Sequence, residues 1–246
     1  MAIHPTIQGL LKRRSVPIDL DPATVQHHAP HRIDKTVADP DVEGVVKAVA
    51  EAQQSALQLA ETEFVVLSDR SRPQDAARAA IAQAASTTGA KVAQRLDAAR
   101  AKLVTSIATI EKGISAPAAP INAKQVAEQA EIRAALARMS DKERRDTIAS
   151  AFAGSKTHVL AALLNGDAFL SGLKDTEIAV HRQRYMKDFH PGPLARRDAL
   201  NKLLAAYDRS AASFIAMVND MSESSAARLA RLRKQQADDA LAAHGE

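Results

Sequence analysis

The sequence lacks cysteine and tryptophan, and aromatic residues make up only 3% of its 246 positions. Without cysteine, no disulfide, thiolate metal site or cysteine nucleophile can form. All but one of the aromatic residues fall between positions 152 and 214. Because large apolar side chains contribute most to core packing, we expect the compact core in the second half of the chain and thinner packing in the first half.

The sequence also has little excess of either charge, since 33 basic and 29 acidic residues leave a formal net charge of only +4. The charges are interspersed, which is typical of a solvated surface rather than of a basic nucleic-acid-binding domain. No apolar run approaches the roughly 20 residues that a membrane-spanning helix needs. The first basic residues follow a short apolar stretch, the reverse of a secretory signal, so we expect synthesis in the cytoplasm and no membrane partner.

Residues 1–40 are rich in proline. Each proline removes a backbone donor and disfavours helix at the preceding residue, so this segment is predicted to be an extended arm that becomes ordered only on another surface. The prolines are Pro5, Pro17, Pro22, Pro30 and Pro40.

Residues 41–115 have the periodicity of long helices. Small apolar residues recur at spacings of three and four, and a turn near Pro73 separates two such runs. This pattern predicts a long, Ala-rich helical hairpin or part of a coiled-coil bundle, with a seam so narrow that we expect it to pack on another subunit. The first seam consists of Val42, Val45, Val49, Ala52, Ala56 and Leu59.

A linker is predicted at residues 116–122, which combine two prolines with small residues. Residues 123–221 are then predicted to form a helical globular unit, with a capping box from Ser140 to Glu143. Residues 222–246 are too polar for a monomer's core and are expected to be a polar C-terminal helix or tail. The predicted fold class is therefore all-α.

No motif for chemistry is complete. His27, His28 and His31 offer three imidazoles, but they lie in the proline-interrupted arm, which has no preformed metal geometry. The segment 154–157 (GSKT) lacks the glycine spacing and the preceding strand of a phosphate-binding loop. We therefore predict a protein that is not an enzyme, with no catalytic residue, cofactor, metal or small-molecule substrate.

Glu177, His181 and Tyr185 share a helix face by their spacing of four. The second histidine of a metalloprotease motif is missing, because positions 178 and 182 are Ile and Arg. Ion pairing at the surface, with His181 partly buried, is the favoured interpretation.

Two segments are predicted to bind partners. The first is the arm, and the second is a basic run near the C-terminus that suits phosphates or an acidic groove on a partner. The residues of these predicted contacts are Ile18, Leu20, His27, His28 and His31 in the arm, and Arg228, Arg231, Arg233 and Lys234 in the basic run.

Residues 139–193 resemble segments of helical structural proteins of tailed-bacteriophage particles. The similarity lies in the SDKERR start at 140–145, the FLSGL turn at 169–173, and the end with Arg184, Tyr185 and 189–191 (FHP). It implies a multi-copy virion component of the head–tail junction or portal, made in the host cytoplasm. Its partners would be further copies of itself and other structural proteins. The alternatives are a DNA-binding or packaging-associated protein, with nonspecific DNA contact, and a cellular helical adaptor subunit.

Overall fold

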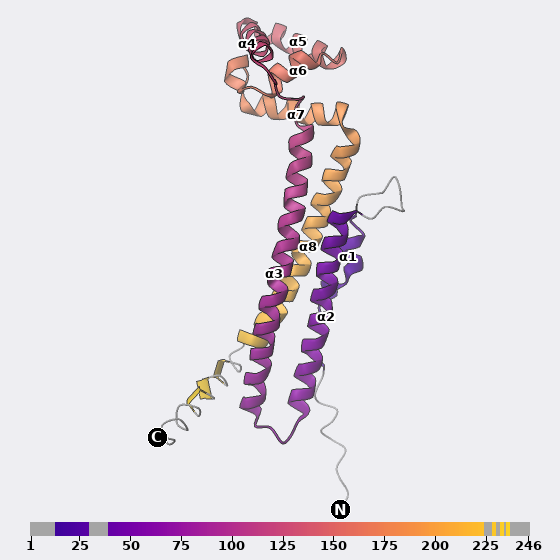
Figure 1. The fold of residues 1–246 in the computed structure, drawn as a ribbon, viewed down its shortest axis with the longest axis vertical. Helices are drawn as coiled ribbons and strands as arrows, with labels where there is room; N and C mark the ends of the chain where they lie inside the picture. Colours follow the sequence, from indigo (N-terminus) through magenta and orange to yellow (C-terminus); the bar gives the residue numbers. More distant parts are fainter. Residues whose placement is uncertain (1–12, 30–38, 224–227, 230–231, 234, 237–246) are drawn as a thin grey trace, which may run out of the picture. The chain divides into compact units, whose positions relative to one another are not determined.

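The computed structural model describes residues 13–29, 39–223, 228–229, 232–233 and 235–236 (Figure 1). Every regular element in these residues is helical, which confirms the predicted all-α fold class. The chain divides into two compact units, with Met1–Val104 and Leu200–Glu246 in unit 1 and Thr105–Ala199 in unit 2.

Unit 1 is built on three long helices. Helix α2 (Pro40–Ser68) is joined by a short turn to α3 (Gln74–Ile114), and α8 (Pro191–Glu223) lies beside both (Figure 1). Arg95 of α3 pairs with Glu51 of α2 at 3.0 Å, and Arg100 of α3 pairs with Asp208 of α8 at 2.9 Å. The partner of the two predicted long helices is therefore, in part, a third helix of the same chain.

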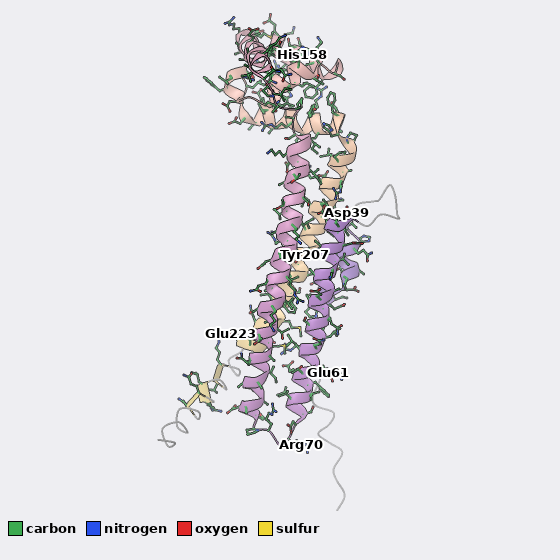
Figure 2. The ribbon with its side chains drawn as sticks, in the orientation of Figure 1. Asp39, Glu61, Arg70, His158, Tyr207 and Glu223 are labelled. Carbon is green, nitrogen blue, oxygen red and sulfur yellow. The ribbon has the colours of Figure 1, made fainter. Side chains whose placement is uncertain are left out.

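The interior of unit 1 is narrow because alanines and a glycine let the helices approach closely. All six residues of the predicted α2 seam are buried. Gly89 of α3 faces Val218 of α8, and a Cβ built on this glycine would lie 2.5 Å from the Val218 Cγ1 atom. Tyr207 of α8 is fully buried and donates its hydroxyl to the Leu96 carbonyl oxygen at 2.5 Å (Figure 2). Desolvation raises the pKa of this phenol.

The described part of the predicted extended arm contains two short helical segments, η1 (Ile18–Leu20) and α1 (Pro22–Gln26). Helix α1 forms because the Asp21 side chain accepts from the Ala23 amide and Pro22 occupies the first turn, where its missing N–H costs nothing. Leu20 and Val25 are fully buried against the long helices, so these two side chains belong to the core of unit 1.

Unit 2 is a cluster of shorter helices: α4 (Ala123–Arg138), α5 (Asp141–Ala153), α6 (Thr157–Leu164), the 3-10 turn η2 (Ala168–Ser171) and α7 (Asp175–Phe189). The predicted capping box at Ser140 is confirmed, with Ser140 and Glu143 bonded in both directions. Side-chain and backbone bonds from Ser140 hold the pKa of Glu143 below its usual range.

The buried guanidinium of Arg144 joins three segments of unit 2. It donates to the carbonyl oxygens of Leu136 and Met139 at 2.9 Å and to that of Gly172. Gly172 ends η2 with φ of 66°, a left-handed conformation that favours glycine. Because a buried guanidinium needs several acceptors, this arrangement fixes the turn after η2 against the corner between α4 and α5.

The unit boundaries differ from those predicted for residues 123–221. From Leu200 onward α8 contributes its apolar face to unit 1, where Leu203, Tyr207 and Phe214 are fully buried. The last residues of α3, from Thr105, belong instead to unit 2. The aromatic residues predicted to share one core are thus divided between two. In the described residues, no helix is both long and apolar enough to cross a membrane.

Candidate protein-binding groove

A groove of about 750 Å³ opens on unit 2 between residues 117–121 and the helices α4, α6 and α7; His158 at its edge is labelled in Figure 2. We call it the α4–α6 groove. It is lined by Pro117, Ala118, Ala119, Ile121, Gln125, Glu128, Gln129, Glu131, Ile132, Thr157, His158, Ala161 and Tyr185.

One wall of the groove is the segment predicted to be a linker. The Asn165 side-chain amide donates to the carbonyl oxygens of Pro117 and Ala118 at 3.2 and 3.3 Å. At the other end of the wall, the Ile121 amide donates to the side chain of Gln125 at 2.9 Å, and the Gln125 amide donates to Asn122 at 2.9 Å. These bonds hold Ile121 at the lip, where its side chain is 84% exposed.

The floor of the groove is apolar and well packed. Ala161 is buried, and Ile132 packs against the core of unit 2. The Tyr185 ring stacks on Phe189 with 4.9 Å between centroids, and its hydroxyl lies 3.4 Å from Nε2 of His190. Burial raises the pKa of Tyr185, which therefore stays neutral. Such a floor can accept apolar side chains without rearranging.

The polar lining of the groove is open to a bound molecule. The Gln129 side-chain amide forms no hydrogen bond with a described residue, and its atoms are not closed off from solvent. Glu131 forms no ion pair with any described residue, and the exposed Glu128 has only a 3.9 Å contact with Lys124. The charged side chains of the lining are these two glutamates, so the groove offers negative charge together with an amide donor and acceptor.

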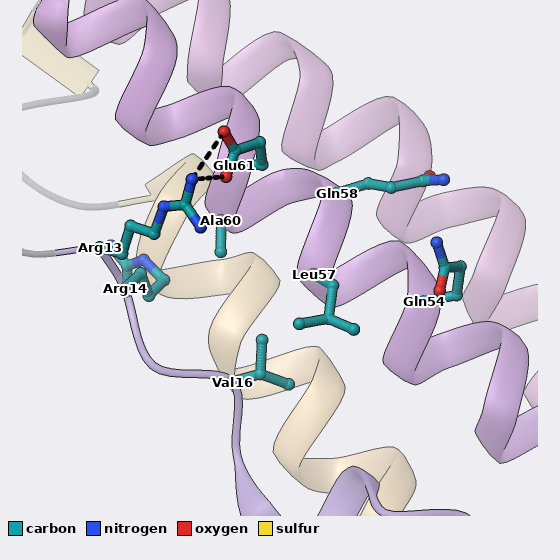
Figure 3. Close-up of a pocket in the computed structure, with 8 residues that line it drawn as sticks. All are labelled: Arg13, Arg14, Val16, Gln54, Leu57, Gln58, Ala60 and Glu61. Carbon is teal, nitrogen blue, oxygen red and sulfur yellow. Dashed lines mark hydrogen bonds and ion pairs between the residues drawn. The ribbon is translucent and has the colours of Figure 1, made fainter.

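A second, smaller pocket of about 400 Å³ lies in unit 1 between the N-terminal segment and α2 (Figure 3). Its arginines are already paired: Arg13 with Glu61 at 2.7 Å, and Arg14 with Glu63 at 2.7 Å and with Asp220. These contacts raise the pKa of Arg14, mainly through the bond to Glu63. The arginines of this pocket therefore have a structural role, because their ion pairs hold the N-terminal segment against α2 and α8.

The predicted arm contacts lie in different environments. Ile18 is 83% exposed, which leaves it accessible to a partner. The prediction for Leu20 does not hold in this structure, because the side chain is fully buried within its own chain. The His27 and His28 rings lie 5.4 Å apart in a T-shaped contact, and His31 lies outside the described residues.

Within the predicted basic run, Arg228 pairs with Glu223 at 3.3 Å and Arg233 with Asp75 at 2.7 Å. Arg231 and Lys234 lie outside the described residues. The two described arginines thus have carboxylate partners in their own chain, which neutralises part of the charge that a phosphate backbone would need.

The described histidines of the two predicted patterns make contacts with other rings. The described residues contain no group of three His, Asp or Glu side chains placed to hold a metal ion. His181 is half-buried and stacks on Phe152 with 6.0 Å between centroids. Burial, and secondarily the nearby Arg184 charge, lowers the pKa of His181. Its described contacts are those of a residue at the edge of a core.

Sequence reasoning missed the residues that build the groove. The spacing of Asn122 and Gln125 is an N-cap signal, and it would have placed Ile121 directly before a helix start. The role of Asn165 had no local signal, because its acceptors lie 47 and 48 positions away. Gln129 resembles any polar residue of a surface helix until its burial is known.

Comparisons of this chain with protein-family models, with curated proteins and with solved structures gave no match.

Proposed function

We propose that this chain is a non-enzymatic structural protein that works in a multi-copy assembly, and that the α4–α6 groove binds a segment of a neighbouring protein. The observation that carries the proposal is the composition of the groove: an apolar floor that includes Ile132 and Ala161, beside the exposed side chain of Ile121 and the carboxylates of Glu128 and Glu131. A bound segment that covers this apolar area would remove it from water.

A protein segment fits the groove better than a phosphorylated metabolite. No lysine or arginine lines the groove, and its charges are those of Glu128 and Glu131. An apolar floor with charged edges is the usual surface for an amphipathic helix laid into a groove. Ile121 and the neighbouring Val126, which is 49% exposed, add accessible apolar area at the lip.

The proposed setting is the particle of a tailed bacteriophage, at the head–tail junction or associated with the portal, after synthesis in the host cytoplasm. The resemblance of residues 139–193 supports this setting. The same residues form α5, α6 and α7, and two of these helices contribute to the groove. The segment that carries the resemblance therefore also supplies part of the proposed binding surface.

The test is the oligomeric state measured by native mass spectrometry and light scattering over a wide concentration range. We expect species larger than a monomer in the wild-type protein and a shift to monomer in Ile121→Glu, which places a charge on the apolar lip. Val180→Glu is the matched control, because Val180 is 66% exposed in the same unit but does not line the groove. A wild-type protein that stays monomeric at every concentration would overturn the proposal.

A further inference from the structure

The α4–α6 groove has the charge and shape to receive a basic, leucine-bearing helix. Glu128 and Glu131 lie on the helix face that forms its edge, and no described residue strongly neutralises either carboxylate. The side-chain oxygen of Gln129 can accept a hydrogen bond from a guanidinium, whose five N–H groups need several acceptors. The apolar floor leaves room between these polar groups for aliphatic side chains.

The C-terminal segment of the chain has the complementary pattern. Leu229 and Leu232 are both helical and lie three positions apart, a spacing that puts side chains on one helix face, and they are 49% and 58% exposed. Arg228 and Arg233 flank them, and the sequence adds two further basic residues, Arg231 and Lys234. Two exposed leucines among four basic residues are the features that an acidic groove with an apolar floor would bind.

We propose that the α4–α6 groove of one copy binds residues 228–236 of a second copy, an inference that rests on the proposed assembly function. The leucines would pack on the floor formed by Ile132 and Ala161. The basic side chains would pair with Glu128 and Glu131, and a guanidinium would donate to Gln129. The contact combines apolar burial with opposite charges.

A second copy is the favoured source because the segment is held in unit 1 of its own chain. Arg233 pairs there with Asp75 and Arg228 with Glu223, while both leucines stay exposed. Exposed ion pairs of this kind contribute about 0 to 1 kcal/mol, so they do not prevent the arginines from changing partners. Because groove and segment are different surfaces, the contact is head-to-tail and extends into a ring or an open array.

The first experiment titrates the full chain into a fluorescent peptide of residues 222–246 and follows anisotropy. We expect saturable binding, about tenfold weaker for the chain with Glu128→Lys and Glu131→Lys. A peptide with Leu229→Ser and Leu232→Ser should lose binding. A peptide with Arg231→Glu and Arg233→Glu should bind the charge-reversed chain better than the wild type. All of the substituted groove residues are exposed, so the variants are expected to fold.

The second experiment separates exchange between copies from binding within one chain. A groove-defective chain (Glu128→Lys, Glu131→Lys) is mixed with a segment-defective chain (Leu229→Ser, Leu232→Ser). One intact groove and one intact segment remain, so native mass spectrometry should show a heterodimer that neither chain forms alone. Peptide binding without a heterodimer would place the segment in its own groove and overturn exchange between copies.

The outcomes also distinguish this inference from the proposed function. Oligomers that depend on Ile121, without any binding of the peptide, would overturn the C-terminal segment as the occupant and leave the assembly function standing. Peptide binding that ignores the two glutamate substitutions would overturn the α4–α6 groove as the site. Monomers that also fail to bind the peptide would overturn both.

Discussion

Asn165 at the end of α6 donates its side-chain amide to the carbonyl oxygen of Pro117, 48 positions earlier in the chain, at 3.2 Å. The same amide reaches the Ala118 carbonyl at 3.3 Å. One side chain therefore fastens the loop before α4 to the end of α6 and sets the position of the groove wall. Because the proposed occupant packs between these two elements, the position of the Asn165 side chain affects the shape of the binding surface.

Replacing Asn165 with Ala should loosen this wall without unfolding unit 2. We expect faster hydrogen exchange at the amides of Ala118, Ala119 and Ile121, and a loss of about 1 kcal/mol of unfolding free energy. Hydrogen-exchange mass spectrometry and urea denaturation measure the two effects. Asn201→Ala is the control, since Asn201 is exposed and its side chain forms no hydrogen bond with a described residue. Unchanged exchange in residues 118–121 would contradict the role given to Asn165.

Gly89→Ala should destabilise unit 1 although alanine favours helix. The new methyl group would lie 2.5 Å from Cγ1 of Val218, and overpacking of this kind costs about 1 to 3 kcal/mol. That cost exceeds the gain in helix propensity, which is at most about 1 kcal/mol. Gly44→Ala is the matched control within α2, because nothing lies within 4 Å of its added Cβ, and it should stabilise the protein.

Double-mutant denaturation tests whether the clash is the cause. In a Val218→Ala background the contact is removed, so Gly89→Ala should change from destabilising to neutral or stabilising. If Gly89→Ala costs the same free energy in both backgrounds, the close approach of α3 and α8 is not the reason for the glycine.

The stability of unit 2 should depend on the protonation of His181. Burial, and then the Arg184 charge, lowers the pKa of His181 below its usual value of 6.5. The unfolded chain therefore binds the proton more readily than the folded chain. The contribution of His181 to stability is complete above the unfolded pKa and is lost as the pH falls through the folded pKa.

We accordingly expect the unfolding free energy to decrease as the pH is lowered from about 7.5 to about 5. His181→Gln should remove part of that decrease, whereas His158→Gln, at an exposed histidine of the same unit, should retain it. Urea denaturation at a series of pH values provides the measurement. If His181→Gln has the wild-type dependence of unfolding free energy on pH, protonation of His181 is not the cause of the decrease.

Local chemistry made much of the secondary structure predictable. Gly172 ends η2 as the residue that tolerates positive φ. The capping box at Ser140 needs only residues three positions apart. Such features depend on neighbours within one helical turn, so a sequence read in short windows contains the information that determines them.

The sequence by itself therefore determined the all-α class, the α2 seam and the start of α5 at the Ser140 capping box. The tertiary structure decided that Leu200 and the rest of α8 pack in unit 1, that Leu20 is buried, and that residues 117–121 form a groove wall. The physical reason is that an amphipathic face specifies only that it must be covered. Many apolar faces of this Ala-rich chain could cover a given helix equally well. Contacts between residues far apart in the sequence, such as Asn165 to Pro117, decide which faces pack together.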